Sequence, residues 1–237
     1  KFCRPYSLAL CLEDTIADDS VEFAEKQLGA TLKRLLEASS DEKFYMPMIF
    51  IRVRSCEQLL RLWKGLSDYS ELITGFIFPK YSVGNADSYN DAMSKINSTV
   101  NRTVYMMPIL ESRDIVEYST RHMVLSDLKN KIDSVKDLVL NIRVGGNDFS
   151  NEFAARRHYD ETIYDILPIS QLLGDILTVF SIEYVVSGPV WEFFSSDNEA
   201  WKHGLMNELK LDKVNGFIGK TVIHPRQISV VNEALKV

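Results

Sequence analysis

The chain has few cysteines and no long apolar run that is free of charge. Its 237 residues include three cysteines, and no two of them form a CxxC pair, so neither a disulfide framework nor a structural zinc site is indicated. The longest apolar stretch, residues 172–186, contains two acidic residues and is too short to span a bilayer. No signal peptide is visible at the start of the sequence. We therefore expect a cytoplasmic protein with reduced thiols and no membrane partner.

An excess of positive charge is also lacking. The 27 basic and 33 acidic residues leave a formal net charge of −6, which offers no general attraction to nucleic acid or anionic lipid. An anionic substrate would therefore need a local pocket of basic groups. Hydrophobic residues make up 46% of the chain and charged residues 25%, and these values are typical of a globular protein with a sizeable core.

Strand-like and helix-like segments alternate along the first part of the chain. Apolar runs rich in β-branched and aromatic residues predict strands at residues 6–14, 46–54, 73–80, 103–110 and 137–145. Apolar residues at helical spacing predict helices at residues 20–37, 56–66, 86–96 and 111–128. Alternating βα units imply parallel strands joined by right-handed crossovers.

The pattern is weaker after residue 148 but continues. Further strands are expected at residues 161–166, 184–190 and 217–223, with helices at residues 170–180 and 227–235. About eight βα units favour a closed (β/α)8 TIM barrel over a doubly wound sheet. Because no linker, repeat or low-complexity segment is found, we expect residues 1–237 to form a single α/β domain.

Three predicted strands end at a charged residue. MIFIRVR places Arg52 near its end, Glu111 follows TVYMMPIL, and DLVLNIRVGGND ends at Asp148. The carboxyl ends of parallel strands converge on one face of a barrel, where catalytic groups usually lie. One basic and two acidic groups there indicate a divalent-metal site that binds an anionic substrate. A structural ion pair on the barrel rim is the alternative.

The same segments carry a resemblance to a known family. SLALCLEDTIADDSVEFAE, IFIRVRS, GFIFPK, PILES, VGGNDFS and GFIGKTVIHPRQISVVNEA stand in the order and at the approximate spacing of the citrate lyase beta subunit and HpcH/HpaI aldolase superfamily. The resemblance covers nearly the whole chain. It implies a (β/α)8 barrel of magnesium-dependent carbon–carbon lyases and aldolases, many of which act on acyl-CoA thioesters.

The resemblance also implies roles for individual residues. PILES matches a motif whose glutamate binds the metal, here Glu111, and GGND matches a motif that supplies a second carboxylate, here Asp148. RVR places Arg52 where the family binds a substrate carbonyl or carboxylate, and LED places Glu13 and Asp14 close to that arginine. The chemistry is consistent, since Mg²⁺ commonly takes one or two protein carboxylates and arginine pairs bidentately with a carboxylate.

Several other positions leave two interpretations open. Lys80, in FPK, could bind a substrate carboxylate or phosphate, or could be an exposed rim lysine. Arg54 replaces a common family asparagine and either adds charge to the pocket or points outward. His224 either belongs to the site or satisfies backbone groups beside Pro225. GFIGKT has too few residues between its glycines for a phosphate-binding P-loop.

Departures from the family pattern limit the expected function. Cys11 and Ser187 stand where relatives often have aspartate, and the sequence ends soon after VVNEALKV, where full-length relatives continue into a C-terminal lid segment. We expect a Mg²⁺-dependent carbon–carbon lyase or aldolase-like protein acting on a small oxo- or hydroxy-acid or its CoA thioester. By resemblance it would be a homo-oligomer, a trimer or hexamer. The alternative is a non-catalytic or regulatory ligand-binding barrel of a bacterial biosynthetic or stress-response gene cluster.

Overall fold

A computed structural model describes residues 6–41 and 44–236, and its centre is one parallel sheet. The strands pair in sequence order, so that each strand neighbours the next one along the chain. They are β1 (Ser7–Cys11), β2 (Met48–Arg52), β3 (Ile73–Phe78), β4 (Tyr105–Leu110), β5 (Ile142–Val144) and β6 (Val186–Ser187). Consecutive parallel strands require a crossover between them, and the helices provide it.

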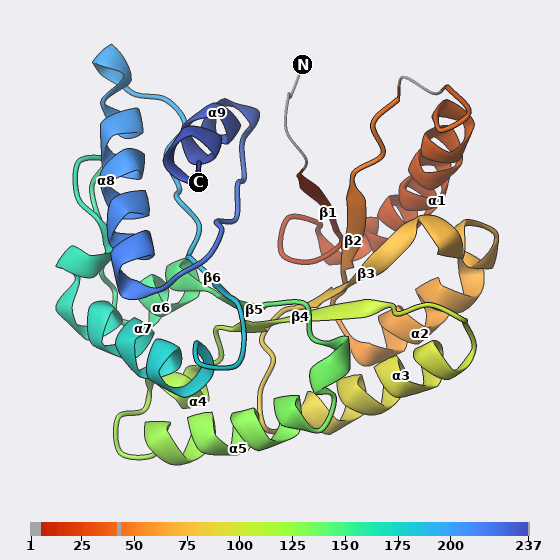
Figure 1. Ribbon diagram of the computed structural model, residues 1–237, viewed down its shortest axis with the longest axis horizontal. Helices are drawn as coiled ribbons and strands as arrows, with labels where there is room; N and C mark the ends of the chain where they lie inside the picture. Colours follow the sequence, from red (N-terminus) through yellow and green to blue (C-terminus); the bar gives the residue numbers. More distant parts are fainter. Residues whose placement is uncertain (1–5, 42–43, 237) are drawn as a thin grey trace.

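Most of the helices lie along the outer side of this curved sheet. They are α1 (Val21–Ala38), α2 (Cys56–Gly65), α3 (Ala86–Ser98), α4 (Arg113–Val116), α5 (Arg121–Asp133), α6 (Gly146–Glu152), α7 (Leu167–Phe180), α8 (Ala200–Asn215) and α9 (Pro225–Ala234). Short 3₁₀ helices are η1 (Asp18–Ser20), η2 (Ser67–Leu72), η3 (Lys136–Leu138), η4 (Ile163–Asp165) and η5 (Asp197–Glu199). Figure 1 shows α2, α3, α5 and α7 following the outside of the arc of strands, and each packs against the next.

Alternating side chains give the sheet two buried faces. On β2, Ile49 and Ile51 belong to the large core between sheet and helices, whereas Phe50 belongs to a smaller cluster with Ile77 and Met107. Because successive side chains of a strand point to opposite faces, this second cluster lines the concave inner face. Both faces are covered, which explains why the strands read as nearly continuous apolar runs.

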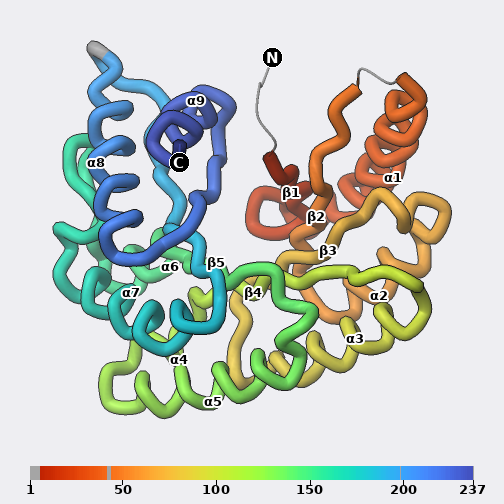
Figure 2. The backbone as a smooth tube through the Cα atoms, viewed as in Figure 1, coloured from red at the N-terminus to blue at the C-terminus, as the bar shows by residue number. Residues whose placement is uncertain are grey.

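The arc of strands is open on one side in Figures 1 and 2. In the described part of the chain β1 pairs only with β2. At the other end, the amide of Ile218 donates to Val186 at 2.8 Å, and Gly188 and Lys220 form an isolated bridge beside β6. Residues 218–220 thus continue the sheet past β6, while α9 lies across the opening from β1.

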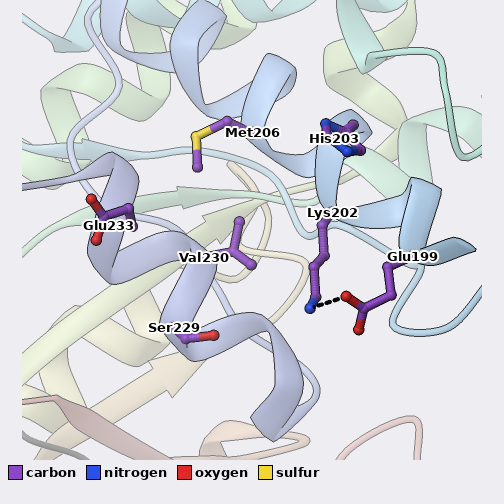
Figure 3. A pocket seen from close by; sticks show the side chains of 7 residues that line it. All are labelled: Glu199, Lys202, His203, Met206, Ser229, Val230 and Glu233. Atoms are coloured by element: carbon purple, nitrogen blue, oxygen red, sulfur yellow. Dashed lines mark hydrogen bonds and ion pairs between the residues drawn. The ribbon is translucent and has the colours of Figure 1, made fainter.

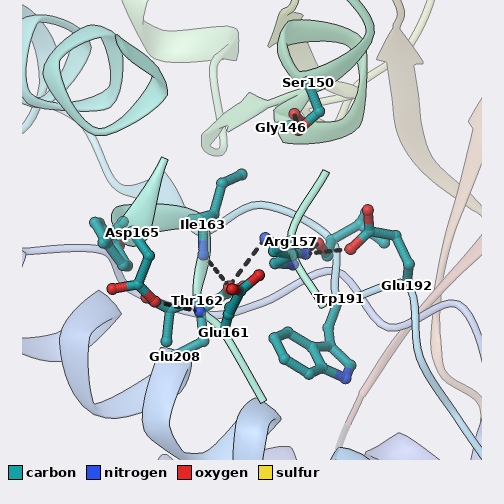
Figure 4. Close-up of polar contacts among 12 residues, drawn as sticks. Gly146, Ser150, Arg157, Glu161, Thr162, Ile163, Asp165, Trp191, Glu192 and Glu208 are labelled. Carbon is teal, nitrogen blue, oxygen red and sulfur yellow. Dashed lines mark hydrogen bonds and ion pairs between the residues drawn. The ribbon is translucent and has the colours of Figure 1, made fainter. Parts of the chain in front are cut away.

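A buried ionic network attaches α8 to this part of the barrel. Arg157 pairs with Glu192 at 2.7 Å and with Glu208 at 2.9 Å, as Figure 4 shows. Lys220 pairs with Glu208 at 2.6 Å and with Asp212 at 2.8 Å. Glu208 and Lys220 have side chains with no solvent exposure, so each charge depends on its partner.

Two of the strands predicted late in the sequence are not formed. Residues 161–166 contain η4 instead, because Thr162 and Asp165 form a capping box in which the Thr162 amide and hydroxyl donate to Asp165 at 2.6 and 2.8 Å. Residues 217–223 form only the bridge at Lys220, because Gly219 adopts a left-handed φ of 89° and interrupts the extended chain. The strand predicted at residues 184–190 is shortened to β6.

The helix pattern also differs in three places, and the first is α6, which the sequence pattern did not predict. The helix predicted at residues 111–128 is divided into α4 and α5. Helix α8 was not predicted, although Trp201, Leu205 and Leu209 recur every four residues, because the buried charges Glu208 and Asp212 share its inner face. In the described ranges no helix is long and apolar enough to cross a membrane.

Candidate active site

The predicted site residues meet at the carboxyl ends of the first five strands. Glu13 and Asp14 follow β1, Arg52 ends β2 and Lys80 follows β3. Glu111 directly follows β4, and Asp148 lies in the first turn of α6, after β5. Parallel strands direct these ends to the same rim, so residues far apart in the sequence become neighbours.

Arg52 lies between two buried carboxylates. Its Nη2 is 2.5 Å from Glu13 Oε2 and 3.6 Å from Glu111 Oε1. The two glutamate side chains are 6% and 3% exposed, whereas the arginine side chain is 25% exposed. Arg52 Nε is buried and has no hydrogen-bond partner in the described part of the chain. The guanidinium is therefore oriented by its neighbours while retaining a donor for a ligand.

Lys80 connects the two sides of the site through its backbone and its side chain. Its φ of 49° lies in the left-handed region, which is unfavourable for a residue with a Cβ. In this conformation its amide donates to Glu111 Oε1 at 2.9 Å. Its Nζ contacts Glu13 at 3.3 Å and Asp14 at 3.4 Å. Lys80 is thus a half-exposed rim lysine that contacts two acidic side chains, and its binding of a substrate anion stays a prediction.

Asp148 is close enough to Glu111 to influence its ionisation. The pKa of Glu111 is raised to about 7, chiefly by burial and then by the negative charge of Asp148, against the opposing effects of Arg52 and the Lys80 amide. The close approach depends on Gly145, since a Cβ at that position would lie 2.2 Å from Glu111 Oε2. The glycine of the GGND motif thus makes room for the glutamate of PILES.

This carboxylate pair fits a hard cation. The described residues contain no group of three or more histidine, cysteine or acidic side chains arranged around a common metal position. Mg²⁺ does not need such a group, because it commonly binds one or two carboxylates and keeps its other positions for water and substrate oxygens. The repulsion that raises the pKa of Glu111 is what a cation between the two carboxylates would relieve.

Other sequence positions fall outside this site. Arg54 pairs with Asp18 at 2.6 Å and donates to the Ile16 carbonyl, so it supports the loop before α1. His224 caps α9, where its Nδ1 accepts from the Arg226 amide at 3.2 Å, which agrees with a structural role. Cys11 and Cys56 are free thiols, and Cys3 lies outside the described residues.

One charged residue of the barrel interior was missed from the sequence. Arg143 lies on β5 between Ile142 and Val144, whose side chains belong to the outer core. Its own side chain therefore faces inward. The signal was present, because Asn141 and Arg143 place polar residues at alternate positions of a strand that is otherwise apolar.

Comparison with known families identifies the fold. Residues 3–237 match the C–C bond lyases of the TIM-barrel fold. The chain belongs to this C–C bond lyase family. The match covers almost all of the sequence, so it confirms both the resemblance and the barrel class predicted from alternating βα units. In the described residues of this chain, the sheet of the barrel has six strands and is open on one side. A comparison with curated proteins gives no match.

Solved structures of similar fold agree with the family assignment. RipC from Yersinia pestis superimposes with a TM-score of 0.68 at 14% identity, over 98% of this chain and 89% of that one. The citrate lyase beta subunit from M. tuberculosis, complexed with oxaloacetate and magnesium, gives 0.62 at 17% identity, over 97% and 86%. The magnesium/glyoxylate complex of Haloferax volcanii malate synthase gives 0.71 at 14% identity, over 96% and 65%. At these identities the likeness establishes the fold alone.

Proposed function

We propose that this member of the C–C bond lyase family is a Mg²⁺-dependent lyase or aldolase that makes or breaks a carbon–carbon bond in a small oxo- or hydroxy-acid, free or as a CoA thioester. The observation that carries the proposal is the pairing of Glu111 with Asp148 beside Arg52 at the strand ends. The structural relatives complexed with magnesium and oxaloacetate or glyoxylate support the same class of chemistry.

In this proposal Glu111 and Asp148 hold the metal. A bound Mg²⁺ would polarise the substrate carbonyl and stabilise the negative charge that develops when the neighbouring bond breaks. Arg52 binds a carboxylate or oxyanion of the substrate through the exposed part of its guanidinium, since a quarter of its side chain is accessible to solvent. Glu13 holds Arg52 directly, while Asp14 acts through Lys80 rather than by contact with the arginine.

Lys80 has a second proposed contribution. Its ammonium group is half exposed beside Glu13 and Asp14, and these charges outweigh the effect of burial and raise its pKa. Lys80 therefore stays positively charged near neutral pH and adds to the attraction for an anionic substrate. By family resemblance we also infer a cytoplasmic homo-oligomer, a trimer or hexamer, whose assembly can be measured by light scattering.

Calorimetry tests the metal assignment. Mg²⁺ with oxaloacetate, pyruvate or glyoxylate should give metal-dependent binding to the wild-type protein. Glu111→Gln and Asp148→Asn should each abolish that binding, and Glu37→Gln, at an exposed position of α1, should leave it unchanged. Unchanged binding in both site variants would remove these residues as ligands.

A turnover assay then separates the enzyme from a ligand-binding barrel. The panel consists of citryl-CoA, malyl-CoA and free 4-hydroxy-2-oxo acids, each with Mg²⁺. Cleavage of any one of them supports the lyase. Metal-dependent binding without turnover of the whole panel would favour the non-catalytic barrel.

A further inference from the structure

The barrel interior contains a cavity of about 610 Å³, lined by β1 and by the chain segment that leads into α9. None of the six site residues lines it, but its Arg143 is near enough to Arg52 and Glu111 for their charges to affect its pKa. Figure 2 shows the backbone open on the side where these segments lie. Apolar side chains from the inner face form one wall, among them Phe50, Ile77 and Met107. The opposite wall is polar and includes Asn141, Arg143, Ser187 and Thr221.

Arg143 is the charged centre of the polar wall. On β5 it pairs in register with Ile109 of β4 and Ser187 of β6, and its side chain faces inward. Its Nη2 donates to Thr221 Oγ1 at 2.5 Å. No carboxylate of the described chain forms an ion pair with it, whereas its neighbour Arg52 has both Glu13 and Glu111.

Arg143 therefore has no ion-pair partner in the described residues, although the charge of Glu111 reaches it. The pKa of Arg143 is lowered to about 10, chiefly by burial and then by the charge of Arg52, against the smaller opposing effect of Glu111. The group still carries its proton at neutral pH. Arg143 is half-buried, and a guanidinium largely removed from water without an ion-pair partner is unfavourable unless a ligand supplies the negative charge.

Asn141 provides a second, independent indication that a polar ligand binds here, because one of its polar atoms has no hydrogen-bond partner in the described residues. It lies two residues before Arg143 on the same face and donates through Nδ2 to Ser187 Oγ at 2.7 Å. Its Oδ1 is buried and has no partner in the ranges that the structure describes. Buried polar atoms are nearly always satisfied, so an unused acceptor beside an unpaired cation indicates a polar ligand.

The shallow hollow between α8 and α9 offers no such feature. Figure 3 shows that its lysine, Lys202, already pairs with Glu199, at 2.6 Å. The other lining residues, which include Ser229, Val230 and Glu233, come from a few turns of two surface helices. The interior cavity is therefore the stronger candidate for a binding site.

We propose that Arg143 binds a second carboxylate of the substrate, so that the protein selects dicarboxylic oxo- or hydroxy-acids over monocarboxylic ones. One end of the substrate is held at Glu111, Asp148 and Arg52, and the distal carboxylate reaches Arg143 in the interior. Thr221 orients the guanidinium, and Asn141 accepts from a hydroxyl of the ligand. This selectivity rests on the proposed function, but the anion site at Arg143 does not.

Binding of oxaloacetate and pyruvate, each with Mg²⁺, tests the selectivity. In the wild type oxaloacetate should bind roughly 10- to 100-fold more tightly than pyruvate, the range expected for one charge-assisted pair. Arg143→Met should remove this difference by weakening oxaloacetate alone, and Arg143→Lys should keep part of it. Arg34→Met, at an exposed position of α1, is the matched control and should change neither affinity. Equal effects on both acids, or none, would overturn the assignment.

A metal-free measurement separates this proposal from the proposed function. In EDTA, succinate should shift one arginine ¹⁵Nε–¹Hε NMR resonance that is missing from Arg143→Met. If that shift is seen while no oxo-acid binds with Mg²⁺, the anion site stands and the lyase assignment fails. Absence of the shift, together with selectivity that survives in Arg143→Met, refutes the anion site.

Protein stability provides a further check. Because Arg143→Met removes an uncompensated charge, it should melt no lower than the wild type. If it does not fold, Thr221→Val serves instead, since losing the hydroxyl that orients the guanidinium should weaken oxaloacetate several-fold and leave pyruvate unchanged. Identical affinities in Thr221→Val and the wild type, with Arg143→Lys also unchanged, would contradict the proposal.

Discussion

The backbone amide of Lys80, held at a left-handed φ of 49°, donates to Glu111 Oε1 at 2.9 Å. This backbone conformation is unfavourable for lysine. It is maintained because it directs the Lys80 amide toward the buried Glu111 carboxylate at the strand ends. Strained backbone of this kind occurs where the surrounding structure requires a particular donor direction. The strain at Lys80 can therefore be measured from the stability of Lys80 variants.

Replacing Lys80 should reveal this strain. Lys80→Gly should be more stable than Lys80→Ala by about 1 kcal/mol, because only glycine adopts the left-handed region without a steric cost. At Lys33, inside α1, the order should reverse by a similar amount, since glycine is unfavourable in a helix. Urea unfolding of the four variants measures both differences. If the alanine variant were the more stable one at Lys80 as well as at Lys33, the backbone at Lys80 would not be strained.

Gly145→Ala should weaken the metal site. The added methyl would lie 2.2 Å from Glu111 Oε2 and force the carboxylate to move. Mutation of a residue that supports a metal ligand typically lowers metal affinity ten- to a hundred-fold. Calorimetry should therefore show roughly that loss of Mg²⁺ affinity. Gly65→Ala, where nothing lies within 4 Å of the added Cβ, is the control and should bind Mg²⁺ like the wild type.

Glu111 should make the stability of the metal-free protein depend on pH. Its pKa is raised from 4.5 to about 7, so between these values the unfolded chain has lost a proton that the folded protein keeps. Stability therefore falls as pH rises through this window. In EDTA, Glu111→Gln should lack this fall and gain about 3 kcal/mol on the wild type between pH 4.5 and 7. A pH-independent difference would show that Glu111 titrates normally.

Removing Arg52 should expose the cost of an unpaired buried acid. Arg52→Met leaves Glu13 only the longer contact with Lys80, at 3.3 Å, and should destabilise the protein by about 3 kcal/mol in denaturant unfolding. Adding Glu13→Gln should recover much of that loss. The surface pair Arg61–Glu25 gives the comparison, since Arg61→Met should cost about 1 kcal/mol or less. Equal losses at both sites would mean that Glu13 is not effectively buried.

Lys220 should be essential for the C-terminal part of the barrel. Lys220→Met removes a partner from both Glu208 and Asp212, and we expect a loss of about 3–5 kcal/mol. Lys202→Met, which breaks the exposed pair with Glu199, should change stability by about 0.5 kcal/mol. Thermal unfolding followed by circular dichroism distinguishes the two. A small effect at Lys220 would indicate that water reaches the network.

The early strands were predictable because their signal is local. The runs around Phe50, Ile77 and Met107 are apolar, of strand length and bounded by turn residues, and β2, β3 and β4 form where these runs predict them. The segment around Lys220 was misjudged, because its apolar residues alternate like a strand while Gly219 breaks the extended backbone. The single-domain organisation of residues 1–237 stays a prediction.

The six proposed site residues came from motifs, and the structure brings all six to one rim. Their individual relations could not be anticipated, since the partner of Asp14 turned out to be Lys80 rather than Arg52. Arg143 escaped notice because a charged residue within a strand looks like an exposed position until the curvature of the sheet is known. Its position on the wall of the interior cavity, and not the residue type, gives Arg143 its significance.

The sequence by itself determined the βα alternation, the barrel class and the family, because hydrophobic periodicity and short motifs are properties of neighbouring residues. Only the tertiary structure decided which charges compensate one another. It brought Glu111 against Asp148 and gave Arg52 two acidic partners, while Arg143 has no ion pair within residues 6–41 and 44–236. The physical reason is that charge interactions depend on distance and burial, and both are set by how the strands curve and pack.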